Sequence, residues 1–455
     1  MGDGTSTPIS PGESGNILSI CLKLMNLLVG YSRRWKSLSL GYGVKPSHQR
    51  ALEHLVADEV PLLETVRAGD VNLFIDFHVS FPGMPPTNTG QVPEPRPSPV
   101  SNVLGKLSSL RSLHLNQGSM STLRISLDWA RLTELSFRFQ PMTFDLAVSS
   151  SITVLKRIAQ TCRSLVTLTF HSNLHPGGSL IEPVIWSTLR ELHLIFTGQF
   201  GDYPSSESPY HTFPAPTGPF PFLPHVKDVY SSIITPQLTR LTLQLGTRHW
   251  GGPSVDNDLP FHKLIKGAPH LAHLQIIGYH IVAAEALSRC LQAAPSLTTL
   301  KLEPERAPHW VGCSMGYGAA RLPSEQVTVP PTDWAPKLLS SLNELGSCPQ
   351  LEVLDCGRCR PEDVTSILEF VQDESRLSRM KQLRADMGEL VAQQVHTMTS
   401  PSLLESLCSL RAMHGISVEL KWGEVEPTPE SRWRMNPYSG LLAPAISPWE
   451  GESDW

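Results

Sequence analysis

A six-residue pattern of leucines and related apolar residues, L-x-x-L-x-L, recurs along this chain and constrains its fold more than any other feature. Eight strong copies occur, at 110–115, 132–137, 165–170, 189–194, 238–243, 271–276, 297–302 and 351–356. Weaker copies begin at Trp35, Leu63 and Met380. The strong copies start between 22 and 54 residues apart, and the shorter spacings equal one leucine-rich repeat. The sequence therefore predicts a stack of such repeats.

Each copy is expected to form a short strand with one buried side. The fourth and sixth positions point the same way because side chains alternate along a strand, so they face the core. The first position packs at the bend that leads into the strand. The third and fifth positions face outward and carry polar residues in most copies. One repeat cannot bury its apolar edge alone, so neighbouring repeats have to stack.

Connectors before several copies are predicted to be helical. Apolar residues recur at three- and four-residue spacing in 150–165, 261–271, 283–297 and 336–351. Three of these connectors end in A-P-H-L, A-P-S-L or C-P-Q-L, where proline ends the helix and fixes the turn into the strand. A strand and a helix in each unit predict the α/β class: a leucine-rich-repeat solenoid whose curved parallel sheet is covered by outer helices.

Three irregular segments interrupt the repeats and are expected to project from the solenoid. They lie near 82–100, 197–236 and 303–336, and the first of them contains seven prolines. The solenoid itself is expected to span 16–424. We expect a disordered N-terminus over 1–15 and a mostly irregular C-terminal tail over 425–455.

Composition narrows the classes of partner and compartment. The chain has 455 residues, 40% of them hydrophobic and 17% charged, with a net charge of −5. No long run of Lys and Arg stands out, so neither nucleic acid nor a membrane surface is expected as a partner. The eight cysteines do not suggest a disulfide framework, and no N-x-[ST] sequon occurs. A reducing compartment, cytoplasm or nucleus, is therefore expected.

The C-x-x-C pair formed by Cys356 and Cys359, with Cys348 upstream, is a candidate for metal or redox chemistry. A zinc site needs four ligands, and the sequence has no second C-x-x-C. A redox pair needs an exposed thiol of low pKa at a helix start. In repeat register Cys356 is the sixth, core-facing position, and Cys359 stands at the turn after the strand. The structural role is preferred to either alternative, and no metal or cofactor is expected.

A second short motif, G-x-S-x-G at 312–316, places Ser314 where a hydrolase would carry its nucleophile. That motif follows a buried strand and opens a helix in α/β-hydrolases. Here a proline-containing stretch precedes it, and the residues that follow make a poor helix start. A serine hydrolase using Ser314 is a remote alternative, and no catalytic residue is expected.

The repeats, with their lead-ins of Cys or Ala followed by P-x-L, resemble the leucine-rich-repeat region of fungal F-box-like proteins. The stretch "SRRWKSLSLGYG" at 32–43 resembles the first strand that follows the F-box in such chains, and the resemblance covers roughly 20–424. It implies a substrate receptor of a cullin ubiquitin ligase, with an F-box that binds a Skp-family adaptor. No L-P-x-E-[IL] opening occurs here, so the adaptor is expected only if an F-box lies upstream of Met1.

The function expected from these observations is protein binding by the strand face, without catalysis. An adaptor-independent interaction scaffold is the alternative to the ligase role. Outward register positions give the candidate binding residues, which are His114, Glu134, Glu191, His193, Arg240, His273, Lys301 and Asp355. The three histidines among them lie several repeats apart, so they are not expected to share a metal ion. The eight candidate residues carry charges of both signs, which argues against a partner recognised by net charge alone.

Overall fold

The computed structural model describes most of the repeat region and leaves gaps in several connections. The described residues are 23–24, 26–40, 57–68, 75–76, 96–97, 105, 107–118, 122–124, 127–139, 151–172, 182–196, 229–245, 259–279, 282–304, 333–390, 394 and 398–424. Within them, no helix is long and apolar enough to cross a lipid bilayer.

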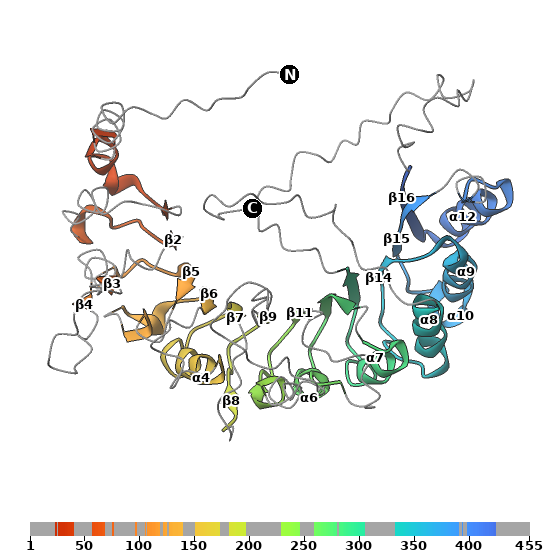
Figure 1. Ribbon diagram of the computed structural model, residues 1–455, viewed down its shortest axis with the longest axis horizontal. Helices are drawn as coiled ribbons and strands as arrows, with labels where there is room; N and C mark the ends of the chain where they lie inside the picture. The colour runs from red at the N-terminus through yellow and green to blue at the C-terminus, as the bar shows by residue number, and fades with distance from the viewer. Residues whose placement is uncertain are drawn as a thin grey trace, which may run out of the picture.

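Twelve strands form one sheet that curves into an arc and lines its inner face (Figure 1). Every strand in it pairs in parallel with its neighbours. In sheet order the strands are β1 (Ser37–Leu40), β2 (Thr65–Ala68), β5 (Ser112–Gly118), β6 (Glu134–Phe139), β7 (Thr167–Ser172), β9 (Glu191–Phe196), β11 (Arg240–Leu245), β12 (His273–Ile277), β13 (Thr299–Glu303), β14 (Val353–Arg358), β15 (Gln382–Leu390) and β16 (Ser417–Glu424). This confirms the predicted solenoid.

The helices lie on the outer, convex side of the arc (Figure 1). The α-helices are α4 (Ser151–Thr161), α6 (His262–Lys266), α7 (Ala284–Leu291), α8 (Trp334–Glu344), α9 (Val364–Gln372), α10 (Glu374–Leu377) and α12 (Pro401–His414). The 3-10 turns are η1 (Ser32–Arg34), η2 (Ala57–Glu59), η4 (Thr122–Arg124), η5 (Trp129–Arg131) and η8 (Pro361–Asp363). Helices α4, α6, α7 and α8 stand where the apolar spacing of the connectors predicts them.

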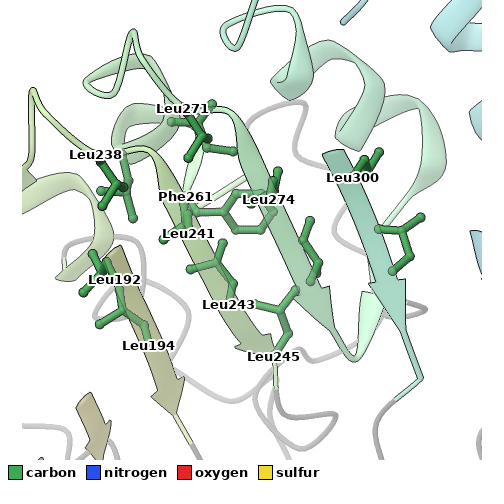
Figure 2. Close-up of a cluster of buried hydrophobic side chains, with 14 of the residues drawn as sticks. Leu192, Leu194, Leu238, Leu241, Leu243, Leu245, Phe261, Leu271, Leu274 and Leu300 are labelled. Atoms are coloured by element: carbon green, nitrogen blue, oxygen red, sulfur yellow. The ribbon is translucent and has the colours of Figure 1, made fainter. Parts of the chain in front are cut away.

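The core lies between the sheet and the helices and is built from the repeat leucines. The fourth positions Leu192, Leu241, Leu274 and Leu300 face one another across successive strands. Each of them is at most 2% exposed. Figure 2 shows these leucines with Phe261, which reaches the same layer from the convex side. Because identical positions stack, each repeat buries the apolar edge of the next.

A row of aromatic side chains extends the core through the middle of the arc. The rings of Phe137 and Phe170 stack with centroids 6.4 Å apart. Phe196 meets Phe170 edge-on at 6.3 Å, and Tyr230 meets Phe196 at 5.4 Å. Phe137 and Phe170 occupy paired positions on β6 and β7, whereas Phe196 pairs with Ser172 and Tyr230 precedes β10. The edge-to-face geometry of the last two ring pairs suits their quadrupoles.

Two short pairings lie outside the main sheet. Strands β8 (Val184–Ile185) and β10 (Ile233–Ile234) pair in parallel, and β3 (Ile75–Asp76) pairs with β4 (Arg96–Pro97) in antiparallel fashion. β10 and the first turn of α8 fall inside stretches that the sequence analysis assigns to insertions. Ile233 and Trp334 are buried, so the core extends further than the loss of the leucine pattern indicates. Most of the three insertions, the N-terminus and the tail lie outside the described residues.

Candidate functional site

The predicted binding residues occupy two parallel rows of the concave face. Glu134, Glu191, Arg240 and His273 belong to the row of third repeat positions, and His114, His193, Lys301 and Asp355 to the row of fifth positions. Register brings Glu191, Arg240 and His273 side by side on β9, β11 and β12. Lys301 stands opposite Asp355 on β13 and β14. All eight side chains are at least partly exposed; their binding role stays a prediction.

A hollow of about 360 Å³ lies over the middle of this face. Side chains from β7, β9, β11, β12 and β13 line it. Five of the predicted residues contribute: Glu191, His193, Arg240, His273 and Lys301. Sequence reasoning did not select the uncharged polar residues between them, which are Thr167, Thr169, Thr242, Gln275 and Thr299. These residues occupy third or fifth repeat positions, and that outward register is the sequence signal that could have identified them.

The charges around the hollow are balanced. Arg240 Nη1 lies 3.7 Å from Glu191 Oε1, and Lys301 forms an ion pair with Glu303. The hydroxyl of Thr242 donates to the side-chain oxygen of Gln275 at 3.4 Å. Exposed ion pairs of this kind contribute little to stability. Groups of a bound partner could therefore replace them at a small cost in free energy. Hydrogen bonding, more than net charge, would select what binds.

His193 sits at the floor of the hollow with one ring nitrogen unsatisfied. Its Nε2 atom is buried and has no hydrogen-bond partner among the described residues. Burial lowers the pKa of His193 below its usual value, so the ring is neutral at physiological pH. Buried polar atoms are normally hydrogen-bonded. Nε2 is therefore a position that a partner group can satisfy.

His171 on β7 is the most strongly shifted histidine of this face. Burial, together with the nearby Arg138 and His193, lowers the pKa of His171 to about 4. Arg138 and His171 occupy facing positions on β6 and β7, two residues beyond the fifth repeat position. Sequence reasoning missed both because the six-residue pattern ends before them.

Ser112, His114 and Glu134 form a hydrogen-bonded group at β5 and β6. Ser112 Oγ donates to Glu134 Oε2 at 2.8 Å and lies 2.9 Å from His114 Nε2. Glu134 Oε1 is 3.6 Å from the same ring nitrogen. In a catalytic triad the acid binds the other ring nitrogen and the histidine accepts the serine proton. Here that proton points to the carboxylate, so the arrangement does not activate Ser112.

A further polar group lies at the C-terminal end of the face. Gln382 Nε2 donates to Glu419 Oε1 at 2.7 Å, and Arg384 Nε lies 3.0 Å from Glu419 Oε2. Arg384 also stands opposite Asp355. Burial raises the pKa of Asp355, although the backbone hydrogen bond from Gly357 and the charges of Lys301 and Arg384 oppose the shift. The weak repeat copy in β15 and the absence of one in β16 concealed Gln382, Arg384 and Glu419 from sequence reasoning.

The cysteines of the C-x-x-C motif are part of the core. Cys348, Cys356 and Cys359 are 1%, 1% and 3% exposed, which confirms the core position predicted for Cys356. Burial raises the pKa of Cys348 to about 12. A hydrogen bond with Cys356 and burial raise the pKa of Cys359. Across the described residues, no three His, Cys, Asp or Glu side chains are placed to hold a metal ion.

Ser314 and its G-x-S-x-G motif lie outside the described residues.

Comparisons with known proteins find a similarity in structure and none in sequence. No protein-family model matches the chain, and no curated protein matches it. Among solved structures, it is similar to a chain of the yeast Rad7 and Elc1 complex, with a TM-score of 0.37 and 11% sequence identity. That similarity covers 84% of this chain and 78% of the other. At this level it does not place the chain in a family.

Proposed function

We propose that this chain is a non-catalytic protein-binding module that holds its partner on the concave face, centred on the hollow over β7 to β13. The observation that carries the proposal is the hollow itself, where five strands present in-register polar side chains around the unsatisfied Nε2 of His193. The six described cysteines are all free, which supports action in a reducing compartment, the cytoplasm or the nucleus.

Quantitative affinity purification of the tagged full chain tests this proposal. Thr242→Arg fills the hollow, and Arg240→Glu reverses a charge at its rim. Arg157→Glu is the matched control because Arg157 is exposed on α4 at the convex side. Partners recovered with the wild type and with Arg157→Glu should be lost with both hollow variants. Equal recovery with all four proteins would refute the concave face as the binding site.

A narrower form of the proposal makes the chain a substrate receptor of a cullin ubiquitin ligase. Its support is the resemblance of the repeats to those of F-box-like proteins. The product of the full transcript, including any residues upstream of Met1, should then co-purify with a Skp-family adaptor. If concave-face partners are recovered without the adaptor or any other ligase component, the chain acts as an adaptor-independent scaffold.

A further inference from the structure

Strand β16 ends the twelve-stranded sheet and, among the described residues, pairs with β15 alone (Figure 1). It is eight residues long, whereas β1 at the other end of the sheet has four. An edge strand of this length presents a row of backbone N–H and C=O groups with which another strand can pair. None of its residues lines the hollow of the concave face. A strand added at β16 would therefore leave that hollow open.

The backbone ladder with β15 determines which groups of β16 point outward. The N–H of Ser417 donates to the carbonyl oxygen of Lys381, the residue before β15. Backbone groups alternate in direction along a strand, so the first, third and fifth residues of β16 bond toward β15. The N–H and C=O groups of Val418, Leu420 and Trp422 then point away from β15. These are the groups that a further strand can bond.

The core layer at β16 is also incomplete. Val418 and Leu420 pair in register with two core residues of β15, Leu383 and Ala385. The two β15 side chains are 0% and 2% exposed, whereas Val418 and Leu420 are only partly buried. Helix α12 packs on β16 and leaves Leu404 48% exposed. Each unit of a repeat stack buries its apolar edge against the next, so an additional neighbour would complete this layer.

The sequence of β16 is complementary to a second copy of itself in the antiparallel direction. With a two-fold axis at Leu420, Val418 lies opposite Trp422 of the second copy, and these outward-facing residues can exchange backbone hydrogen bonds. Glu419 then lies opposite Lys421 of the second copy on both sides of the axis. Opposite charges at such positions stabilise a pair of strands, whereas an axis at Glu419 or at Lys421 would place like charges together.

We propose that the chain forms a two-fold dimer in which β16 pairs antiparallel with β16 of a second copy, so that one sheet continues through both molecules. The arrangement is closed, because both molecules use the same edge. It brings the two α12 helices beside each other, where the exposed Leu404 side chains can be buried. Because the interface is limited to one strand and one helix from each molecule, we expect a dissociation constant in the micromolar range.

Sedimentation equilibrium of the full chain from about 1 to 100 μM tests the proposal, and the wild type should shift from the mass of one chain to that of two. Lys421→Glu places a carboxylate opposite Glu419 of the second copy twice, and should raise the dissociation constant about tenfold. Glu419→Lys should have a similar effect because it places cations together. A mixture of the two variants restores opposite charges and should associate more tightly than either variant alone.

Lys263→Glu is the matched control for the change of charge. Lys263 is exposed on α6, which precedes β12 and is not part of this edge, so its replacement should leave the dissociation constant unchanged. Circular dichroism confirms that each variant is folded. Hydrogen exchange read at single residues locates the contact. The N–H groups of Val418 and Leu420 should exchange quickly in dilute protein and slowly in the dimer.

Three results would overturn the proposal. In the first, the wild type stays monomeric at about 100 μM, which would assign the edge to other residues of the same chain or to a different protein. In the second, a dimer forms without slowing exchange at Val418 and Leu420. In the third, Lys263→Glu weakens association as much as Lys421→Glu does, or the mixture of Lys421→Glu and Glu419→Lys associates no better than either variant alone.

Discussion

The carboxylate of Asp355 accepts a hydrogen bond from the backbone N–H of Gly357 at 3.1 Å. One strand later Asp386 accepts the same bond from Gly388 at 2.8 Å. Both glycines have positive φ, 66° and 67°, and the strand register shifts beside each of them. The D-x-G motif therefore forms a bulge twice in succession. The Asp355 carboxylate stabilises the bulge of its own strand through this hydrogen bond. Its predicted contact with a partner is therefore at most part of its role.

Gly357→Ala is expected to destabilise the solenoid more than Gly415→Ala does, although both glycines have a similar positive φ. A Cβ at Gly357 would lie 2.5 Å from the carbonyl oxygen of Leu302 and 2.7 Å from Cε1 of Tyr279. We expect a loss of about 2–4 kcal/mol in the free energy of unfolding, from backbone strain and overpacking together. Gly415, with φ of 68° and open space around it, is the control. Urea denaturation showing equal losses for Gly357→Ala and Gly415→Ala would contradict the close packing.

Arg376→Met is expected to destabilise the C-terminal repeats. The buried guanidinium of Arg376 donates to the carbonyl oxygens of Leu342, Ser347 and Cys348 at 3.2, 2.8 and 2.8 Å. These carbonyls lie at and after the end of α8, and those of Leu342 and Cys348 also accept backbone N–H groups, from Ser347 and Leu351. The loss of three buried hydrogen bonds from a charged donor should lower the free energy of unfolding by about 3 kcal/mol.

Arg379→Met is the control for this effect in denaturant titrations. Arg379 is exposed and donates to one carbonyl, that of Pro349, at 2.7 Å. Its replacement should cost less than about 1 kcal/mol. A similar loss for both variants would mean that Arg376 does not brace the end of α8.

Stability is expected to fall in mild acid because His171 resists protonation in the folded state. Its pKa is about 4 when folded and about 6.5 when unfolded. As the pH drops from 6.5 toward 4, the unfolded chain binds a proton that the folded chain does not, so the free energy of unfolding decreases. The contribution is about 1–2 kcal/mol between pH 7 and pH 5.

His171→Gln should reduce that acid sensitivity, measured as the difference in unfolding free energy between pH 7 and pH 5. His270→Gln changes an exposed histidine in the turn between α6 and β12 and should behave as the wild type does. An identical pH dependence in all three proteins would show that His171 is not the residue responsible.

Thiol labelling should distinguish Cys408 from the other described cysteines. Cys408 is exposed on α12, whereas Cys162, Cys348 and Cys359 are buried, and burial raises the pKa of Cys162 to about 11. Thiolates are the reactive form, so iodoacetamide at neutral pH should modify Cys408 long before the five described cysteines that are buried. Mass spectrometry of peptides from native and denatured protein measures the order. Labelling of Cys359 as fast as that of Cys408 would contradict its place in the core.

The repeat pattern was sufficient to predict the parallel sheet, because apolar positions at fixed spacing can be buried only by stacking. Even the weak copies at Trp35, Leu63 and Met380 precede strands β1, β2 and β15. The last strand, β16, was not predicted, because Gly415 stands where its first leucine would be. Val418 and Leu420 alone are too short a pattern to indicate a strand.

The sequence predicts which residues of the candidate site lie on the concave face, but it does not predict the hollow that they line. Register placed Glu191, Arg240 and His273 on one face, but the depth of the hollow depends on the small threonines around them. Register also does not reveal that His193 Nε2 is buried without a hydrogen-bond partner among the described residues.

The parallel sheet also sets a length for whatever lies along it. Neighbouring strands are about 4.8 Å apart, so twelve of them span roughly 50 Å. An extended segment advances about 3.4 Å per residue, and about 15 residues would run from β1 to β16. The hollow over five strands takes about six of those residues. The number of strands that an extended ligand contacts thus depends on its length, and each shortening by one or two residues removes the contacts with one strand.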